Sequence, residues 1–276
     1  MSVARPAVAP GVGGLVVRAG VLAYVGALVA LPLTALLAAG LGQGATALWA
    51  AVSAPVAAEA LRLTLTTAGI MAVVNAFMGT ATAWVLARYD FVGRSLLSAL
   101  VDLPFAIPTL VTGVMLVLLF GPQSPVGGWM TGNGVPIAFA APSIVLALLF
   151  ITVPFVVRAV EPVLMEQDPA EEEAARTLGA GTFTVFRRVL LPPLMPSLLS
   201  GTIRSYARAL GEFGSIVVVS GNIPHQTLTA PIYVFGEIES GRAEVAAAVS
   251  VVLLAVALGL NVAARAIERF TGVSRA

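Results

Sequence analysis

Three charged residues, Arg204, Arg208 and Glu212, recur at intervals of four within an otherwise apolar stretch. On one continuous helix this spacing places all three side chains on one face. Two guanidinium groups offer forked donors that suit a dianion, and a nearby carboxylate would weaken its hold. The pattern predicts a face that lines a path for an anion. Two alternatives stay open: a structural ion pair within the helix bundle, and an Arg204 side chain that reaches the membrane surface.

Other reactive patterns are scarce. All 15 basic residues are arginine, so the chain has no lysine for a Walker A loop or a Schiff base. It has no cysteine, and its single histidine, His225, has no acidic neighbours in sequence that would complete a metal site. Neither a zinc-helix motif nor an aspartate-rich motif is present. We therefore expect no catalytic residue, no metal site and no cofactor in this chain, which argues against a membrane-embedded enzyme.

The elements that position these residues are predicted to be transmembrane helices. The chain is 58% hydrophobic and only 11% charged, with a mean hydropathy of +0.97. A bilayer crossing takes roughly 20 apolar residues. Six windows meet this requirement and predict an all-α membrane protein of about six transmembrane helices: 19–41, 63–87, 96–120, 138–157, 198–220 and 245–264.

Arginine placement orients the predicted helices. With the N-terminus inside, eleven arginines fall in internal segments, and only Arg62 and Arg242 fall in external loops. This bias predicts cytoplasmic tails at 1–18 and 267–276, a membrane domain at 19–266 and a cytoplasmic loop at 161–196. The external loops are too short to capture a solute, so capture would need a separate protein. A net charge of +1 gives no reason to expect a nucleic acid partner.

The third window carries Asp102 and is interrupted by Pro104 and Pro108. The prolines predict either a break that turns backbone groups toward a path or a simple packing kink. The part before them could be a short interfacial helix. For Asp102 we expect a helix cap or an ion pair with Arg94 rather than contact with an anion.

The cytoplasmic loop contains a complete helix specification in "DPAEEEAARTLGAG", residues 168–181. Asp168 suits the N-cap, Pro169 the first helical position, and Glu171 the third position of a capping box. Gly179 suits the helix end. A second short helix is predicted from Thr182 to the stop at Pro192 and Pro193. The two helices should project from the membrane and offer a small-residue face to a soluble partner, the alternative being an ordinary solvated loop.

This loop resembles the EAA loop of permease subunits in binding-protein-dependent ABC importers. The family pattern is Glu-Ala-Ala, three residues, Gly, nine residues, an aliphatic residue, one residue and Leu-Pro. Its seven positions are matched without gaps by Glu173, Ala174, Ala175, Gly179, Val189, Leu191 and Pro192. The resemblance implies the type I (MetI-like) permease fold. It also implies a coupling helix that docks on a separate cytoplasmic ATPase, with Glu173 facing a basic group there and Gly179 forming the elbow.

Three further stretches resemble the sulfate/thiosulfate importer permeases, most closely their T-type subunit: 100–113, 150–180 and 208–227. The similarity covers roughly residues 60–265. It implies a homologous W-type permease partner, two ATPase copies that hold ATP and Mg, and a periplasmic or lipid-anchored sulfate-binding protein. It places the chain in the bacterial inner membrane. Molybdate and tungstate permeases share "GEFG" (211–214), so they stay an alternative. An ion-coupled secondary anion transporter is an alternative of a different class, but it gives no reason for an EAA loop.

Overall fold

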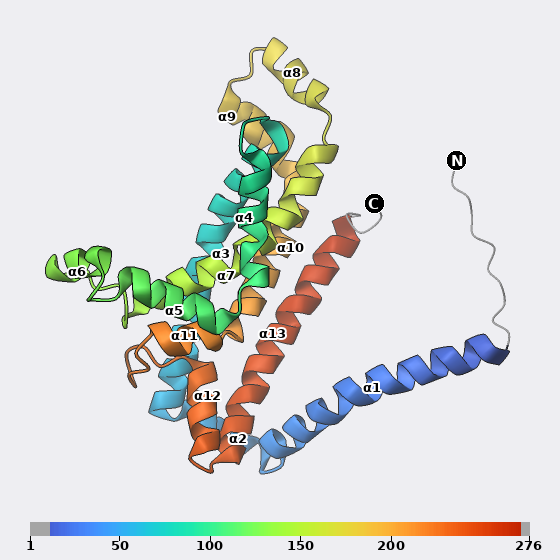
Figure 1. The fold of residues 1–276 in the computed structure, drawn as a ribbon. Helices are drawn as coiled ribbons and strands as arrows, with labels where there is room; N and C mark the ends of the chain where they lie inside the picture. The colour runs from blue at the N-terminus through green and yellow to red at the C-terminus, as the bar shows by residue number, and fades with distance from the viewer. Residues whose placement is uncertain (1–11, 272–276) are drawn as a thin grey trace.

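A computed structural model describes the backbone of residues 12–271 and the side chains of residues 14–269. Within these residues every regular element is helical, as predicted (Figure 1). The elements in chain order are α1 (Val12–Leu41), α2 (Gly44–Ser53), α3 (Pro55–Arg88), α4 (Arg94–Ala106), α5 (Thr109–Phe120), α6 (Pro125–Gly132), α7 (Ala141–Glu166), α8 (Pro169–Thr177), α9 (Thr182–Val185), the π-helix η1 (Phe186–Leu190), α10 (Leu191–Leu210), α11 (Gly214–Val219), α12 (Ala230–Glu239) and α13 (Ala243–Thr271).

Four helices, α1, α3, α7 and α13, are long and apolar enough to cross a membrane. They cover the first, second, fourth and sixth predicted windows. The third window is the bent pair α4 and α5, whose axes differ by 114°. By length and apolarity the described part of the chain thus holds four spanning helices, or five if the bent pair counts as one, rather than six continuous spans.

The fifth window, 198–220, is not one helix. α10 ends at Leu210, three residues follow without helix, and α11 begins at Gly214. The prediction of a continuous crossing there is wrong, because a hydropathy window averages over residues and does not detect a glycine-flanked break. The side chain of Glu212 stabilises the break. It accepts a hydrogen bond from the backbone N–H of Ser215 at 3.0 Å and so caps the first turn of α11.

The bundle core forms where α3 and α10 pack against α7. A Cβ at Gly79 of α3 would lie 2.9 Å from the side chain of Val156, and one at Gly201 of α10 would lie 2.7 Å from Ala159 Cβ. Close backbone approach through small residues is a common packing mode of membrane helices, where water does not drive association. Between α3 and α7, Asn75 also donates to Thr152 Oγ1 at 2.8 Å. These contacts hold α3, α7 and α10 together, and the cytoplasmic segment is attached to these three helices.

α1 differs from the other long helices in its packing. None of the residues in its most apolar window is buried, whereas 56% of the corresponding window of α7 is buried. Its last turn contacts α13, where a Cβ at Gly40 would lie 2.7 Å from Val251. From there the helix runs away from the bundle (Figure 1). The predicted tail at 1–18 overlaps α1 from Val12 onward, and Arg5 lies outside the described residues.

The two broken helices pack on each other. A Cβ at Gly113 of α5 would lie 2.7 Å from the carbonyl oxygen of Ser215 at the start of α11. Both breaks therefore lie in one region of the fold. The break predicted in the third window falls at Ile107 and Pro108, while Pro104 lies inside α4. α4 is not an isolated surface helix, because its buried Val101 joins a core cluster that includes Val157 of α7.

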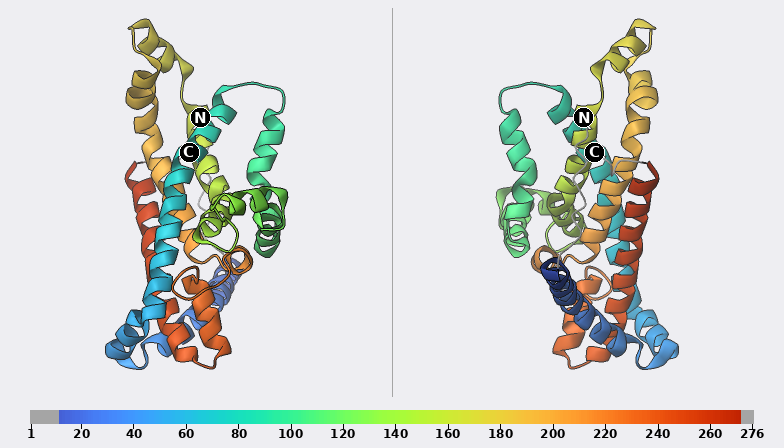
Figure 2. Two further views of the ribbon diagram at one scale, coloured as in Figure 1. Left: turned by 90° about the vertical axis from the view of Figure 1, so that its left-hand side faces the viewer. Right: turned by 90° about the vertical axis from the view of Figure 1, so that its right-hand side faces the viewer.

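The segment from α8 to η1 projects beyond the ends of α3 and α7, as both views of Figure 2 show. The described end of α13 lies toward this side of the bundle, and α2 and α12 lie at the opposite end (Figure 1). Arg88 and Arg94 flank the projecting side, and Arg242 follows α12 at the other. This arrangement agrees with the orientation predicted from arginine placement.

Candidate functional site

The projecting helix α8 forms where the sequence predicted it. Asp168 is its N-cap and accepts from the N–H of Ala170 at 2.9 Å, and Pro169 occupies the first position. Gly179 has a φ of +86°, in the left-handed region that glycine adopts at low cost. The N–H of Gly179 donates to Arg176 O at 2.9 Å and thereby closes the last turn. Local signals alone specify this helix and the elbow after it.

α8 has an inner and an outer side. On the inner side, Glu172 lies 2.8 Å from Nη2 of Arg88, the last residue of α3, and their side chains are only 12% and 15% exposed. On the outer side, Glu173 and Ala174 are exposed, and Leu178 is 88% exposed. The two adjacent glutamates therefore have different tasks. Glu172 holds α8 to its own chain, and Glu173 is available to a partner.

The membrane-proximal root of the segment is α9 and η1. The π-helix inserts an extra residue into the turn, a feature that often occurs at functional sites. Phe186 stacks on Trp84 of α3, and Leu190 is buried in a core cluster with residues of α3 and α7. The predicted stop at Pro192 and Pro193 is wrong. α10 begins at Leu191, so the prolines occupy its first turn, where a missing N–H costs nothing.

The seven positions that resemble the EAA pattern separate into two groups in space. Glu173, Ala174 and Gly179 are exposed on the projecting half, and Ala175 is half-buried beside them. At the root, Val189 and Leu191 are half-buried, and Pro192 is exposed. One group thus lies at the exposed tip of the segment, and the other lies at its joint with the bundle.

Each member of the charged face predicted on the fifth window forms an ion pair. Arg204 lies 2.6 Å from Glu268 of α13, which also accepts from Ser200 Oγ at 2.5 Å. This contact fits the structural alternative for Arg204, because it ties α10 to α13.

Arg208 and Glu212 form a second pair, with Nη2 3.0 Å from Oε2. Glu212 lies beyond the end of α10, so the premise of one continuous helical face fails for it. Its side chain is only 2% exposed and accepts from both the N–H and the Oγ of Ser215, each at 3.0 Å. Glu212 therefore stabilises the break. The half-exposed Arg208 is the member that could meet an anion, and lining of a path stays a prediction.

Asp102 neither caps a helix nor pairs with Arg94, the two roles predicted for it. Both its oxygens accept from Arg158 of α7, at 2.8 Å and 2.6 Å, and Arg158 Nη2 also donates to Ser98 O at 2.9 Å. Arg158 pairs with the buried Glu161 as well. Arg94 instead bonds to Asp90. The Arg158 cluster ties α4 to α7. The sequence could not reveal it, because the partners are far apart along the chain.

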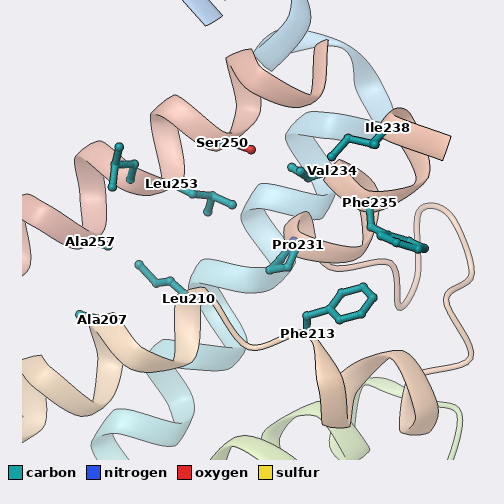
Figure 3. A pocket seen from close by; sticks show the side chains of 12 residues that line it. Ala207, Leu210, Phe213, Pro231, Val234, Phe235, Ile238, Ser250, Leu253 and Ala257 are labelled. Atoms are coloured by element: carbon teal, nitrogen blue, oxygen red, sulfur yellow. The ribbon is translucent and has the colours of Figure 1, made fainter. Parts of the chain in front are cut away.

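An apolar cavity of about 460 Å³ lies where the end of α10 meets α12 and α13 (Figure 3). Phe213 and Phe235 form one wall, with ring centroids 5.2 Å apart, and Ser250 carries the side-chain oxygen drawn at its rim. Such a lining offers few donors to an anion. We therefore assign no anion site to this cavity.

His225 lies in the loop before α12 as predicted, is exposed, and has a φ of +63°. Its Nδ1 lies 2.5 Å from Glu59 Oε2. Among the residues that the structure describes, no group of three His, Cys, Asp or Glu side chains could hold a metal ion.

Residues 75–272 match the family described as "Binding-protein-dependent transport system inner membrane component". The chain belongs to this family. The match begins within α3 and extends past the described end of α13, so it includes the projecting segment and its root. The members of this family are membrane components of transport systems, in keeping with the expectation of a permease rather than an enzyme.

Two relatives within the family are named as permeases of sulfate transport systems. The chain is 42% identical over 246 residues to "Probable sulfate transport system permease protein cysT" of Nephroselmis olivacea, covering 88% of this chain and 87% of the relative. It is 43% identical over 218 residues to "Sulfate transport system permease protein CysW" of Synechocystis, covering 79% of each. Both T-type and W-type permeases are thus homologues of the chain.

The fold has a solved counterpart in the crystal structure of a bacterial alginate ABC transporter in complex with an alginate-bound periplasmic protein. The TM-score is 0.74 at 18% identity, covering 93% of this chain and 95% of that one. At this identity the likeness establishes the fold alone, which is that of an ABC importer permease.

Proposed function

We propose that this chain is the T-type permease subunit of an ATP-driven sulfate and thiosulfate importer in the bacterial inner membrane. It forms half of the translocation path beside a homologous W-type permease. Two copies of a cytoplasmic ATPase supply the energy, and ATP and Mg bind there rather than in this chain. A periplasmic or lipid-anchored binding protein delivers the anion to the external side.

The observation that supports energy coupling is the outer surface of α8. Glu173 and Ala174 are exposed there, and Leu178 is 88% exposed although it is apolar. An exposed apolar side chain at the tip of a projecting helix favours a protein partner over solvent. The acidic Glu173 beside it would suit a basic group of that partner.

The proposed cycle uses α8 as the point of contact between motor and bundle. Closure of the ATPases on ATP draws the two coupling helices of the permease pair together and turns the cavity outward. Hydrolysis and release reverse this motion and open the cavity inward. The chain itself breaks no bond. Its half-exposed Arg208 supplies a cation near the paired helix breaks, and Glu212 limits the net positive charge.

The substrate assignment is supported by the similarity to sulfate transport system permeases, and uptake measurements test it. A strain lacking this subunit is complemented with the chain, and labelled sulfate and labelled molybdate are offered separately. We expect restored sulfate uptake that competes with thiosulfate and depends on the ATPase subunit. Uptake of molybdate alone would transfer the assignment to the molybdate and tungstate permeases. Uptake that persists without the ATPase would instead indicate a secondary transporter.

A further inference from the structure

Arg88 and Glu172 join α3 to α8 across 84 positions of the chain, with Nη2 and Oε1 2.8 Å apart. We infer that this ion pair is the link through which α8 moves α3, so that Arg88 and Glu172 are positioning residues for energy coupling. The inference rests on the proposed function, because it assumes that α8 docks on an ATPase. The inference concerns how a movement of α8 reaches the membrane-spanning helices of this chain.

The pair forms at one of the two half-buried positions of α8, Glu172 and Ala175. α8 has no buried residue, yet the Glu172 side chain is only 12% exposed. Covalently, α8 is held through Gln167 and Asp168 on one side and through the glycine elbow on the other, and both are non-helical. Such connections transmit little force, because they bend. A side-chain contact to a long helix is the stiffer route.

Hydrogen bonds around Arg88 bring two further elements, α7 and η1, to the same point. Its Nη1 donates to the carbonyl oxygen of Gln167, the residue after α7, at 3.3 Å. The Gln167 side chain donates in turn to Leu190 O at the end of η1, at 3.4 Å. The ends of α3, α7 and η1 therefore meet where α8 is attached. Motion of Glu172 acts on this junction.

α3 is suited to carry the motion across the membrane. It is a helix of 34 residues, which spans about 50 Å at a rise of 1.5 Å per residue. Near its external end, Thr64 Oγ1 accepts from the N–H of Ala230, the first residue of α12, at 2.9 Å. One uninterrupted helix thus connects the cytoplasmic attachment of α8 with the external helix α12.

The geometry of the pair suggests how to test it. Arg88 Nη2 has a close ionic approach but no aligned hydrogen bond among the described residues. The attraction is therefore mainly one of opposite charges, and exchanging the two residues should preserve it. Removing the charge of Glu172 leaves Arg88 shielded and uncompensated, which is costly. Removing the charge of Arg88 leaves Glu172 with the longer contact to Arg176, at 3.9 Å.

The experiment compares Glu172→Gln, Arg88→Gln and the exchanged double variant R88E/E172R in the purified complex reconstituted into liposomes. Glu171→Gln is the matched control, because Glu171 is exposed on the same helix and its side chain makes no ion pair or hydrogen bond among the described residues. Three quantities are measured: ATPase subunit retained, ATP hydrolysed, and sulfate accumulated. The ratio of sulfate accumulated to ATP hydrolysed reports coupling.

We expect each single variant to retain the ATPase subunit and to lower this ratio at least about fivefold, the low end of coupling effects between sites in proteins. The exchanged variant should recover most of the ratio, and Glu171→Gln should match the wild type. An unchanged ratio in both single variants, or an exchanged variant no better than they are, would overturn the inference. Loss of the ATPase subunit from the single variants would also count against it, because the pair would then act in docking.

A second pair of substitutions guards against a folding defect. The chain has no cysteine, so Arg88→Cys with Glu172→Cys can be joined by a short thiol-reactive linker in a complex whose other subunits lack cysteine. The same preparation is assayed before and after linking. A rise in the transport ratio on linking supports the inference, and an unchanged ratio contradicts it. If the proposed docking itself is wrong, Glu173 variants will retain the ATPase subunit, which is a separate readout.

Discussion

Trp84 of α3 and Phe186 of η1 stack with their ring centroids 5.2 Å apart and their planes inclined by 27°. The contact joins the root of the projecting segment to the same helix that carries Arg88. α3 is thus attached to the segment twice, by an aromatic stack in the membrane-proximal part and by an ion pair at its end. The glycine elbow and the short helix α9 lie between the two attachments, so the chain can bend there.

Replacement of Trp84 by alanine should destabilise the root of the segment. The variant loses the stack on Phe186. Because Trp84 is only half-buried, the cost should stay below that of a fully buried aromatic residue, about 3–5 kcal/mol. The loss of stability is measured by thermal unfolding of the detergent-purified complex, which is followed with a fluorescent dye rather than with tryptophan fluorescence. Trp49→Ala is the control, because Trp49 is exposed on α2. Equal melting temperatures for the two variants would show that the stack contributes nothing.

Gly201→Ala should separate α10 from α7. The added methyl group would approach Ala159 Cβ at 2.7 Å and Phe155 O at 3.0 Å, and overpacking of this kind costs about 1–3 kcal/mol. Alanine otherwise favours a helix over glycine by about 1 kcal/mol. Gly236→Ala in α12 provides the comparison, since a Cβ there meets nothing within 4 Å. The melting temperature should fall for the first variant and stay level or rise for the second.

Arg158→Gln should be more harmful than Asp102→Asn. The first change leaves the buried Glu161 without its ionic partner, whereas the second removes a half-exposed carboxylate. Breaking a buried pair from one side costs about 3–5 kcal/mol, and an exposed pair contributes about 0–1 kcal/mol. Asp90→Asn, which removes only the exposed pair with Arg94, should resemble wild type. The order of the three melting temperatures checks the prediction, and a reversed order for Arg158 and Asp102 would refute it.

Acid should weaken the external end of the bundle through Glu237. Arg242, just beyond α12, donates to both Glu237 oxygens at 2.5 Å and 2.8 Å, and this hydrogen-bonded cation lowers the pKa of Glu237 from its ordinary value of 4.5. A carboxyl whose pKa is depressed on folding stabilises the fold above its unfolded pKa. That contribution is lost as the pH falls through the folded pKa.

The difference between wild type and Glu237→Gln isolates this effect from other carboxylates. Wild type should be the more stable at about pH 6, and the gap between the melting temperatures should narrow as the pH falls below about 4.5. A gap that is constant with pH would mean that the carboxylate charge does not matter to the fold.

The sequence predicted the parts of the fold that short-range chemistry decides. Asp168, Pro169 and Gly179 lie within one turn of the helix ends they define, so α8 could be recognised from its own residues. Apolar windows likewise located α3, α7 and α13. The proline break between α4 and α5 followed from residue types, but its bend of 114° did not.

The contacts that organise the candidate site link distant positions and left no signal in one sequence. Glu172 stands beside Glu173 in a run of three glutamates, and only the fold distinguishes the inward one from the outward one. Asp102 was assigned to the nearby Arg94, but the packing of α4 on α7 brings Arg158 closer. The break after Leu210 depends on Glu212 capping α11, a role that its regular spacing from Arg208 concealed.

The central claim is that α8 receives the work of a separate ATPase through its outer surface. The most direct test is ATP-driven sulfate accumulation in liposomes that contain the complex with Glu173→Arg, compared with Glu171→Arg on the same helix. We predict that Glu173→Arg abolishes accumulation and weakens retention of the ATPase subunit, while Glu171→Arg preserves both. Full accumulation by the Glu173→Arg complex, with its ATPase retained, would contradict the account.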